Sequence, residues 1–262
     1  MALFSRRKKI AVVELFGTIG GNIKSPVYER IFSEIRREGK YRALVLDVDS
    51  PGGAVPASDY LYRSVARIAE EKPVVASIRG VGASGAYLIS CAAQKIVASP
   101  GSIVGSIGVI SIRPVLQELF QRMGVSVAVH KSGDFKDMGA FWRSSTPEED
   151  QKLQEFIDEP FNSFITTVAK ARKMDEDRVR DLATGEVFWA PKARAAGLID
   201  ELGDLDCAID LAAKLSGAPR RPVTIRPRRG MRERIFRPLA GSLVESLAEE
   251  MERRLWMASL KY

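Results

Sequence analysis

Histidine is almost absent from this 262-residue chain, which contains one copy, His130, and only two cysteines, Cys91 and Cys207. The cysteines form no spacing motif, so the sequence argues against a metal site and favours buried thiols in a reducing compartment. A serine nucleophile needs a base beside it. If His130 is not that base, a neutral lysine is the leading alternative, since serine–lysine pairs are a known variant of the catalytic triad.

Long apolar runs are absent as well. No stretch approaches the roughly 18 apolar residues that a membrane-spanning helix needs. Residues 6–16 mimic the start of a signal peptide, but their apolar part is short, contains Glu14 and leads into no clear small-residue cleavage site. We therefore interpret residues 10–16 as a first strand and expect a cytoplasmic protein that is not exported.

Positive charge is concentrated near the C-terminal end. The formal net charge is +7, and the stretch 220–237, with eight arginines against Glu233, accounts for all of it. Apolar residues at helical spacing over 239–255 then predict an amphipathic helix. This helix would pack on a partner subunit or on its own domain, and peripheral membrane contact through residues 220–255 is the alternative. Few aromatic residues accompany the arginines, which argues against nucleic-acid binding.

Between residues 10 and 131, short apolar runs alternate with helical patterns, which predicts an α/β fold with a parallel sheet. The predicted strands are 10–16, 43–48, 73–78, 95–98, 107–112 and 125–130. The predicted helices are 27–37, 57–70, a long helix from Pro147 that is interrupted at Pro160, 175–183, 190–196 and 205–215.

Two glycine-containing turns follow predicted strands. In the segment 49–53, Gly52 and Gly53 let the backbone turn and present N–H groups to a developing oxyanion. In the segment 82–87, Ser84 would lie exposed at a helix start, with the Gly85 N–H as a second oxyanion donor. His130 follows Ser84 too soon for an α/β-hydrolase, in which an acid and then a histidine come later. A plain turn and close helix–sheet packing are the other interpretations.

Lys136 lies in a polar loop after the apolar run that ends near His130. A lysine base must be neutral, so its pKa must fall by roughly three units from ~10.4, which burial can supply. Asp134 and Asp137 would oppose this fall unless they point away. Ser106, in a polar turn, could hydrogen-bond the base and hold it in place. A solvated lysine and a turn serine are the ordinary alternatives.

Four ordered motifs resemble those of the signal peptide peptidase A family, serine–lysine peptidases of the Clp protease/crotonase fold. They are Ser50-Pro51-Gly52-Gly53, residues 82–87, residues 105–109 and residues 131–137, and the resemblance covers roughly residues 10–216, with a closing motif at 195–203. It implies that Ser84 is the nucleophile, Lys136 the general base and Ser106 the residue that orients the lysine. It also implies an oxyanion hole of Gly52 or Gly53 with Gly85, and no metal or cofactor.

The resemblance further implies a Clp/crotonase-like superhelix of ββα units over 10–217, between a basic tail (1–9) and a basic linker with an amphipathic helix (218–262). It implies an endopeptidase for extended apolar peptides such as remnant signal peptides, in a ring- or dome-shaped homo-oligomer whose active sites are assembled between protomers. Two features depart from the family: Asp49 replaces a common Asn, and the N-terminal membrane anchor of many members is missing. The alternatives are a stomatin-type protease of membrane-protein tails, a crotonase-type acyl-CoA enzyme and a non-catalytic scaffold.

Overall fold

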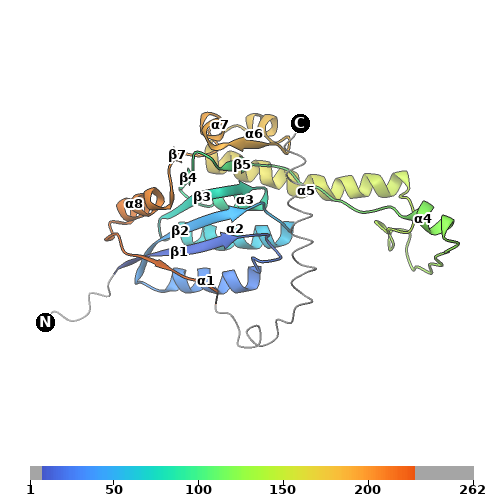
Figure 1. Ribbon diagram of the computed structural model, residues 1–262, viewed down its shortest axis with the longest axis horizontal. Coiled ribbons are helices and arrows are strands. Elements are labelled where there is room, and N and C mark those ends of the chain that lie inside the picture. Colours follow the sequence, from blue (N-terminus) through green and yellow to red (C-terminus); the bar gives the residue numbers. More distant parts are fainter. Residues whose placement is uncertain (1–7, 228–262) are drawn as a thin grey trace. The chain divides into compact units, whose positions relative to one another are not determined.

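A mostly parallel sheet with helices on both faces forms the centre of the computed structural model, which describes residues 8–227 (Figure 1). The strands are β1 (Lys9–Phe16), β2 (Tyr41–Ser50), β3 (Val74–Ala83), β4 (Lys95–Ala98), β5 (Ile103–Gly105), β6 (Val187–Trp189), β7 (Glu201–Leu202) and β8 (Pro222–Thr224). Their order is β6-β5-β3-β2-β1-β8, with β4 beside β3 and β7 beside β4. Among the pairs in these residues, only β5–β6 is antiparallel.

The helices cover the sheet because its central strands are apolar on both faces, as buried parallel strands are. They are α1 (Ser25–Arg37), α2 (Val55–Ala69), α3 (Gly85–Ser90), α4 (Gln117–Arg122), α5 (Pro147–Arg172), α6 (Glu176–Leu182), α7 (Ala190–Ala195) and α8 (Leu205–Ser216). Leu44 and Leu46 belong to the core on the α1–α2 side, whereas Val45 and Val75 pack with Ala208 of α8. The predicted α/β class is confirmed.

Two predicted strands, 107–112 and 125–130, do not form. Residues 109–146, which we call the arm, reach away from the sheet beyond the start of α5 (Figure 1). Ile110 and Ile112 are 80% and 83% exposed, and Val127 is 46% exposed. An apolar run becomes a strand only beside a partner, and within residues 8–227 nothing pairs with these segments.

The predicted interruption of the long helix at Pro160 is also wrong, because α5 runs without a break from Pro147 to Arg172, 26 residues in all. Proline removes one helical hydrogen bond, here to the carbonyl of Phe156. Phe156 is 77% exposed, so this part of α5 lies at the surface. The predicted helix start is confirmed, since Thr146 and Glu149 form a reciprocal capping box there.

The compact unit of the chain extends to Ile225. Strand β8 lies within the predicted linker but pairs with β1, and the Ile225 N–H donates to the Val12 carbonyl at 2.8 Å. Most of the predicted tail and the predicted helix at 239–255 lie outside the described residues, so the domain division stays a prediction. Within the described part of the chain, no helix has the length and apolar character to cross a membrane.

Tyr87 anchors the short helix α3 in the core. Its ring is fully buried, and its hydroxyl donates to the Leu198 carbonyl at 2.8 Å. Burial raises the pKa of Tyr87 well above its usual value, which keeps the hydroxyl a donor. We expect Tyr87→Phe to lower the free energy of unfolding by about 1–2 kcal/mol, because it leaves the Leu198 carbonyl without this donor. Denaturant unfolding measures the loss.

The matched control is Tyr41→Phe. Tyr41 is also a buried tyrosine, 7% exposed, and the described residues give its hydroxyl no hydrogen-bond partner. Tyr41→Phe should therefore change the free energy of unfolding by no more than about 0.5 kcal/mol. Equal losses in the two variants would show that the Tyr87–Leu198 hydrogen bond contributes nothing.

Candidate active site

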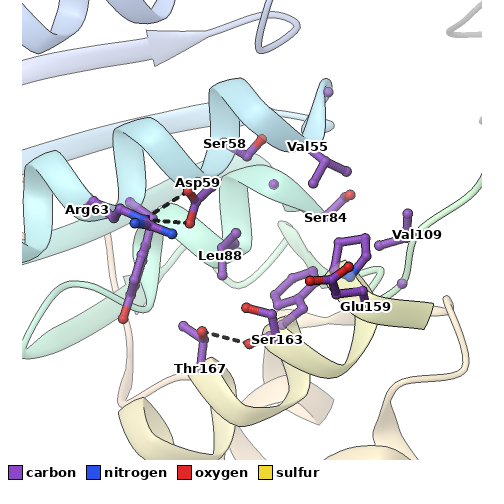
Figure 2. Close-up of a pocket in the computed structure, with 16 residues that line it drawn as sticks. Val55, Ser58, Asp59, Arg63, Ser84, Leu88, Val109, Glu159, Ser163 and Thr167 are labelled. Atoms are coloured by element: carbon purple, nitrogen blue, oxygen red, sulfur yellow. Dashed lines mark hydrogen bonds and ion pairs between the residues drawn. The ribbon is translucent and has the colours of Figure 1, made fainter. Parts of the chain in front are cut away.

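Ser84 lies on a sharp turn between β3 and α3. Its φ is 51° and its ψ −125°, a conformation that non-glycine residues rarely adopt and that is common where a side chain is held for function. The turn is fixed on both sides. The Ser84 N–H donates to the Gly105 carbonyl at 2.8 Å, and the Ser84 carbonyl accepts from the Leu88 N–H at 3.0 Å. Figure 2 shows the Ser84 side chain in the space between α2 and α5.

The glycine turn after β2 lies directly against Ser84. A Cβ placed on Gly52 would stand 2.8 Å from both the Ser84 Cβ and the Gly85 backbone nitrogen. Gly52 and Gly53 have φ values of 99° and 151°, which favour glycine. The two predicted oxyanion segments therefore lie together, although they are about thirty residues apart in the sequence.

The hydrogen bonds of this turn distinguish Gly53 from Gly52. The Gly52 N–H already donates to Ser50 Oγ at 3.1 Å. On either side of Gly53, the Gly52 carbonyl accepts from the Ile19 N–H at 2.8 Å, and the Ala54 N–H donates to the Ile19 carbonyl at 3.0 Å. In such a parallel bridge the middle N–H points to the opposite side. The Gly53 N–H is therefore the one available to a ligand, and Gly53 lines the cavity described below.

Ser106 and Gly85 lie beside the same turn. Ser106 follows Gly105, the acceptor of the Ser84 N–H, and its own φ is 48°. Its N–H donates to the Glu186 carbonyl at 2.7 Å, which holds this segment against β6. Gly85 packs so closely on Ser58 that a Cβ there would overlap the Ser58 hydroxyl. The structure thus gathers Ser84, Ser106 and the three predicted oxyanion glycines around one turn.

Lys136 is not brought to this place within one chain. It lies on the arm, it is exposed, and it is not among the residues that line the cavity at Ser84. His130 is exposed on the same arm. Figure 1 shows the arm directed away from α3. One copy of the chain therefore assembles the nucleophile and oxyanion candidates and leaves the candidate base elsewhere.

A cavity of about 280 Å³ opens beside Ser84. Its walls come from the two glycine turns, from α2 and from the middle of α5: Gly53, Val55, Ser58, Asp59, Tyr62, Arg63, Ser84, Gly85, Leu88, Gly108, Val109, Glu159, Pro160, Ser163, Phe164 and Thr167. On the α2 wall, Arg63 Nε and the Asp59 carboxylate, one helical turn apart, form an ion pair at 2.9 Å, as Figure 2 shows. The lining combines apolar side chains with polar and charged ones, and a cavity that offers both can bind and orient a ligand.

Sequence reasoning missed the helical walls of this cavity. Val55, Asp59 and Tyr62 recur at helical spacing on α2, and Glu159 and Ser163 do so on α5. Spacing places such residues on one helix face. It does not say that both faces meet at Ser84, which depends on how the two helices pack around α3.

The unusual Asp49 has a structural partner. One of its carboxylate oxygens accepts from the backbone N–H of Val81 at 3.0 Å, so Asp49 ties the end of β2 to β3. Its carboxylate is thereby directed to the sheet rather than to the Gly53 N–H. Over residues 8–227, no cluster of three side chains suited to a metal is present.

Comparison with known proteins identifies relatives. The model of Peptidase family S49 matches residues 66–218, which contain Ser84, Ser106 and Lys136. A Synechocystis protein named as a candidate protease is 38% identical over 213 residues, 81% of this chain and 76% of that protein. The chloroplastic serine protease SPPA of Arabidopsis thaliana is 34% identical over 84% of this chain. Protease 4 of Salmonella typhi is 36% identical over 75% of it. The chain spans about a third of these last two proteins, 34% and 32% of their lengths.

Two solved structures share the fold. A membrane-bound stomatin-specific protease matches with a TM-score of 0.53 at 15% identity, over 84% of this chain and 99% of that one. ClpP1 of Listeria monocytogenes matches with a TM-score of 0.51 at 14% identity, over 75% and 93%. These matches confirm the predicted Clp-type α/β fold, and at such identities they carry no more than the fold.

Proposed function

Because the chain belongs to peptidase family S49 and is a serine peptidase, we propose that Ser84 is its nucleophile and Lys136 its general base. The observation that carries this proposal is the strained turn that holds Ser84 at a cavity beside the N–H groups of Gly53 and Gly85. A serine on a sharp strand-to-helix turn next to backbone N–H donors is the arrangement that acyl transfer requires.

The reaction then follows from these groups. Neutral Lys136 takes the Ser84 proton while Ser84 Oγ attacks the carbonyl carbon of the substrate. The N–H groups of Gly53 and Gly85 bind the developing oxyanion, and each such donor is worth about 3 kcal/mol. The Lys136 ammonium then protonates the leaving amine, and water hydrolyses the acyl-enzyme with Lys136 again as base. Ser106 orients the lysine.

Lys136 would come from a neighbouring copy of the chain. The arm that carries it exposes many apolar side chains, between 41% and 83% of each: Ile110, Ile112, Val115, Leu119, Met123, Val125, Val127, Val129, Phe135 and Phe141. Apolar exposure on this scale marks a protein interface. A homo-oligomer of the ring or dome type would cover it and bring the arm of one copy to the Ser84 cavity of the next.

The cavity beside Ser84 supports extended peptides with apolar side chains as substrates. Val55, Leu88 and Phe164 form its apolar part, which suits an apolar side chain. Remnant signal peptides are the substrates that we propose, with the apolar tail of a membrane protein as the alternative. Membership of a peptidase family argues against the acyl-CoA enzyme and the scaffold. The cytoplasmic location and membrane contact through residues 220–255 stay predictions.

Labelling by a fluorophosphonate probe tests the nucleophile. We expect the wild-type oligomer to react covalently at Ser84, identified by peptide mass mapping, and Ser84→Ala to remain unlabelled. The rate of labelling should rise with pH through a single ionisation, because only the neutral lysine accepts the serine proton. Ser102, a buried serine nearby in the sequence, supplies the control variant Ser102→Ala, which should still react. Labelling at any other residue, or none in the assembled protein, would overturn the proposal.

A further inference from the structure

Asp137, the residue after Lys136, is held by two cations. Its side chain is 9% exposed. Arg143 donates to it through two nitrogens, Nε and one terminal guanidinium nitrogen, both at 2.9 Å, and Lys131 Nζ donates at 2.7 Å. Two-pronged arginine–carboxylate pairs fix geometry as well as charge. The backbone of the Lys136 loop is therefore fixed one residue away from the candidate base.

Arg143 also binds a second carboxylate, that of Glu149. Glu149 is 4% exposed, and the guanidinium donates to it at 2.8 and 2.5 Å. Glu149 in turn accepts from the Thr146 N–H and so belongs to the cap of α5. Arg143 thus ties the Lys136 loop to the first turn of the helix whose middle lines the Ser84 cavity.

The charges of this cluster cancel, since Lys131 and Arg143 face Asp137 and Glu149. Hydrogen bonds from Arg143, and then from Lys131, hold the pKa of Asp137 well below its usual range. The Arg143 hydrogen bonds, with that from the Thr146 backbone, lower the pKa of Glu149 to about 2. Both carboxylates are thus charged at neutral pH, and both are directed to Arg143.

The other charged groups around the loop are Asp134 and Lys152. Asp134 is exposed, and its backbone carbonyl accepts from Lys131 Nζ at 2.8 Å. Lys152, on α5, lies 4.9 Å from the centre of the Phe135 ring. Asp137 is therefore the carboxylate whose orientation is fixed next to Lys136, and Arg143 fixes it.

We propose that Arg143 is a positioning residue for the general base: it holds the Lys136 loop on α5 and keeps the Asp137 carboxylate away from the lysine ammonium. The inference rests on the proposed function of Lys136. Without the guanidinium, Asp137 would keep only the single contact from Lys131 and would be free to turn toward Lys136. A carboxylate that pairs with an ammonium favours the protonated form of that ammonium. The lysine would then accept the Ser84 proton only at higher pH.

The test is the pH profile of kcat/KM for an apolar peptide, measured on the full-length oligomer. We expect Arg143→Gln to move the midpoint upward by about one pH unit, since an opposite charge at close range shifts an ionisation by about 1–3 units. Below the midpoint this is a loss of about tenfold. In the double variant Arg143→Gln, Asp137→Asn the midpoint should return to the wild-type value, because the released carboxylate is gone. Arg143→Lys should shift less than Arg143→Gln.

Arg220→Gln is the matched control, because Arg220 also pairs with two carboxylates, Asp206 and Asp210, but on the exposed side of α8. Its midpoint should not move. If Arg143→Gln does not fold, two other variants test the inference. Arg143→Lys should move the midpoint of the pH profile upward, and Asp137→Asn should leave it unchanged. A lower maximal rate with an unchanged midpoint in every Arg143 variant would show a purely structural role and overturn the inference. Ser84→Ala and Lys136→Ala in the same assay report separately on the proposed function.

Discussion

Ser84→Ala and Lys136→Ala should each lower kcat/KM for an apolar peptide by more than about 10⁴-fold, and the double variant should lose no more than either single one. Members of a nucleophile–base pair act as a unit, so removal of one leaves the other without a role. The residual rate would come from the cavity and the N–H groups of Gly53 and Gly85, which neither substitution removes. Initial rates at several enzyme concentrations measure the loss.

Mixing the two inactive variants separates a shared site from one built within a single chain. Ser84→Ala subunits keep the lysine, Lys136→Ala subunits keep the serine, and the arm places the lysine outside the Ser84 cavity of its own copy. With equal amounts of the two variants mixed at random in a cyclic oligomer, about one interface in four would join an intact serine to an intact lysine, so up to a quarter of the wild-type rate should return.

Differently tagged subunits, captured together, establish that mixed oligomers have formed. Mixed oligomers without activity would refute a lysine supplied by the neighbour. Activity that survives in Lys136→Ala alone would refute the lysine as base, and His130, on the same arm, would be the next candidate to test.

The sheet and its helices were predictable because their sequence periods reflect burial within one chain. Strand 43–48 is apolar except for Asp47, and in β2 all six of its residues are buried. The runs 107–112 and 125–130 are also mostly apolar, but the described residues do not cover them as they cover β2: Ile112 is 83% exposed. Composition records that a segment is apolar. It does not record whether the partner is the same chain or another copy.

The candidate site also has one part that local sequence predicts and another that depends on contacts made by the fold. Ser84, Gly52 and Gly53 belong to turns that local sequence identifies, and parallel strands bring the ends of β2 and β3 to one edge of the sheet. The choice between the N–H groups of Gly52 and Gly53 depends on Ser50 Oγ and on Ile19, contacts that no motif contains. Arg143 could not be identified from a motif either. Its proposed role depends on hydrogen bonds to two carboxylates, those of Asp137 and Glu149, which only the folded arm and the start of α5 bring to it.

Gly53→Ala should lower kcat/KM by about 10²- to 10³-fold, the loss that follows removal of one oxyanion donor. At a φ of 151°, a Cβ on residue 53 would overlap the Ile19 carbonyl oxygen and stand 2.8 Å from the Ile19 nitrogen. Both neighbours are backbone atoms that already hydrogen-bond residues 52 and 54, so the turn itself must move. The Gly53 N–H would leave the cavity while Ser84 keeps its place on β3 and α3.

The effect should fall on kcat rather than on KM, because the lost donor binds the oxyanion of the transition state and not the ground-state peptide. Fluorophosphonate labelling of Ser84 should slow in parallel, since the phosphoryl oxygen of the probe occupies the same position. Gly39→Ala is the control: a Cβ at Gly39 has no neighbour within 4 Å, and its activity should be that of the wild type. A Gly53→Ala enzyme with the wild-type kcat would show that the oxyanion is bound elsewhere, and the Gly85 N–H would then be the donor left to test.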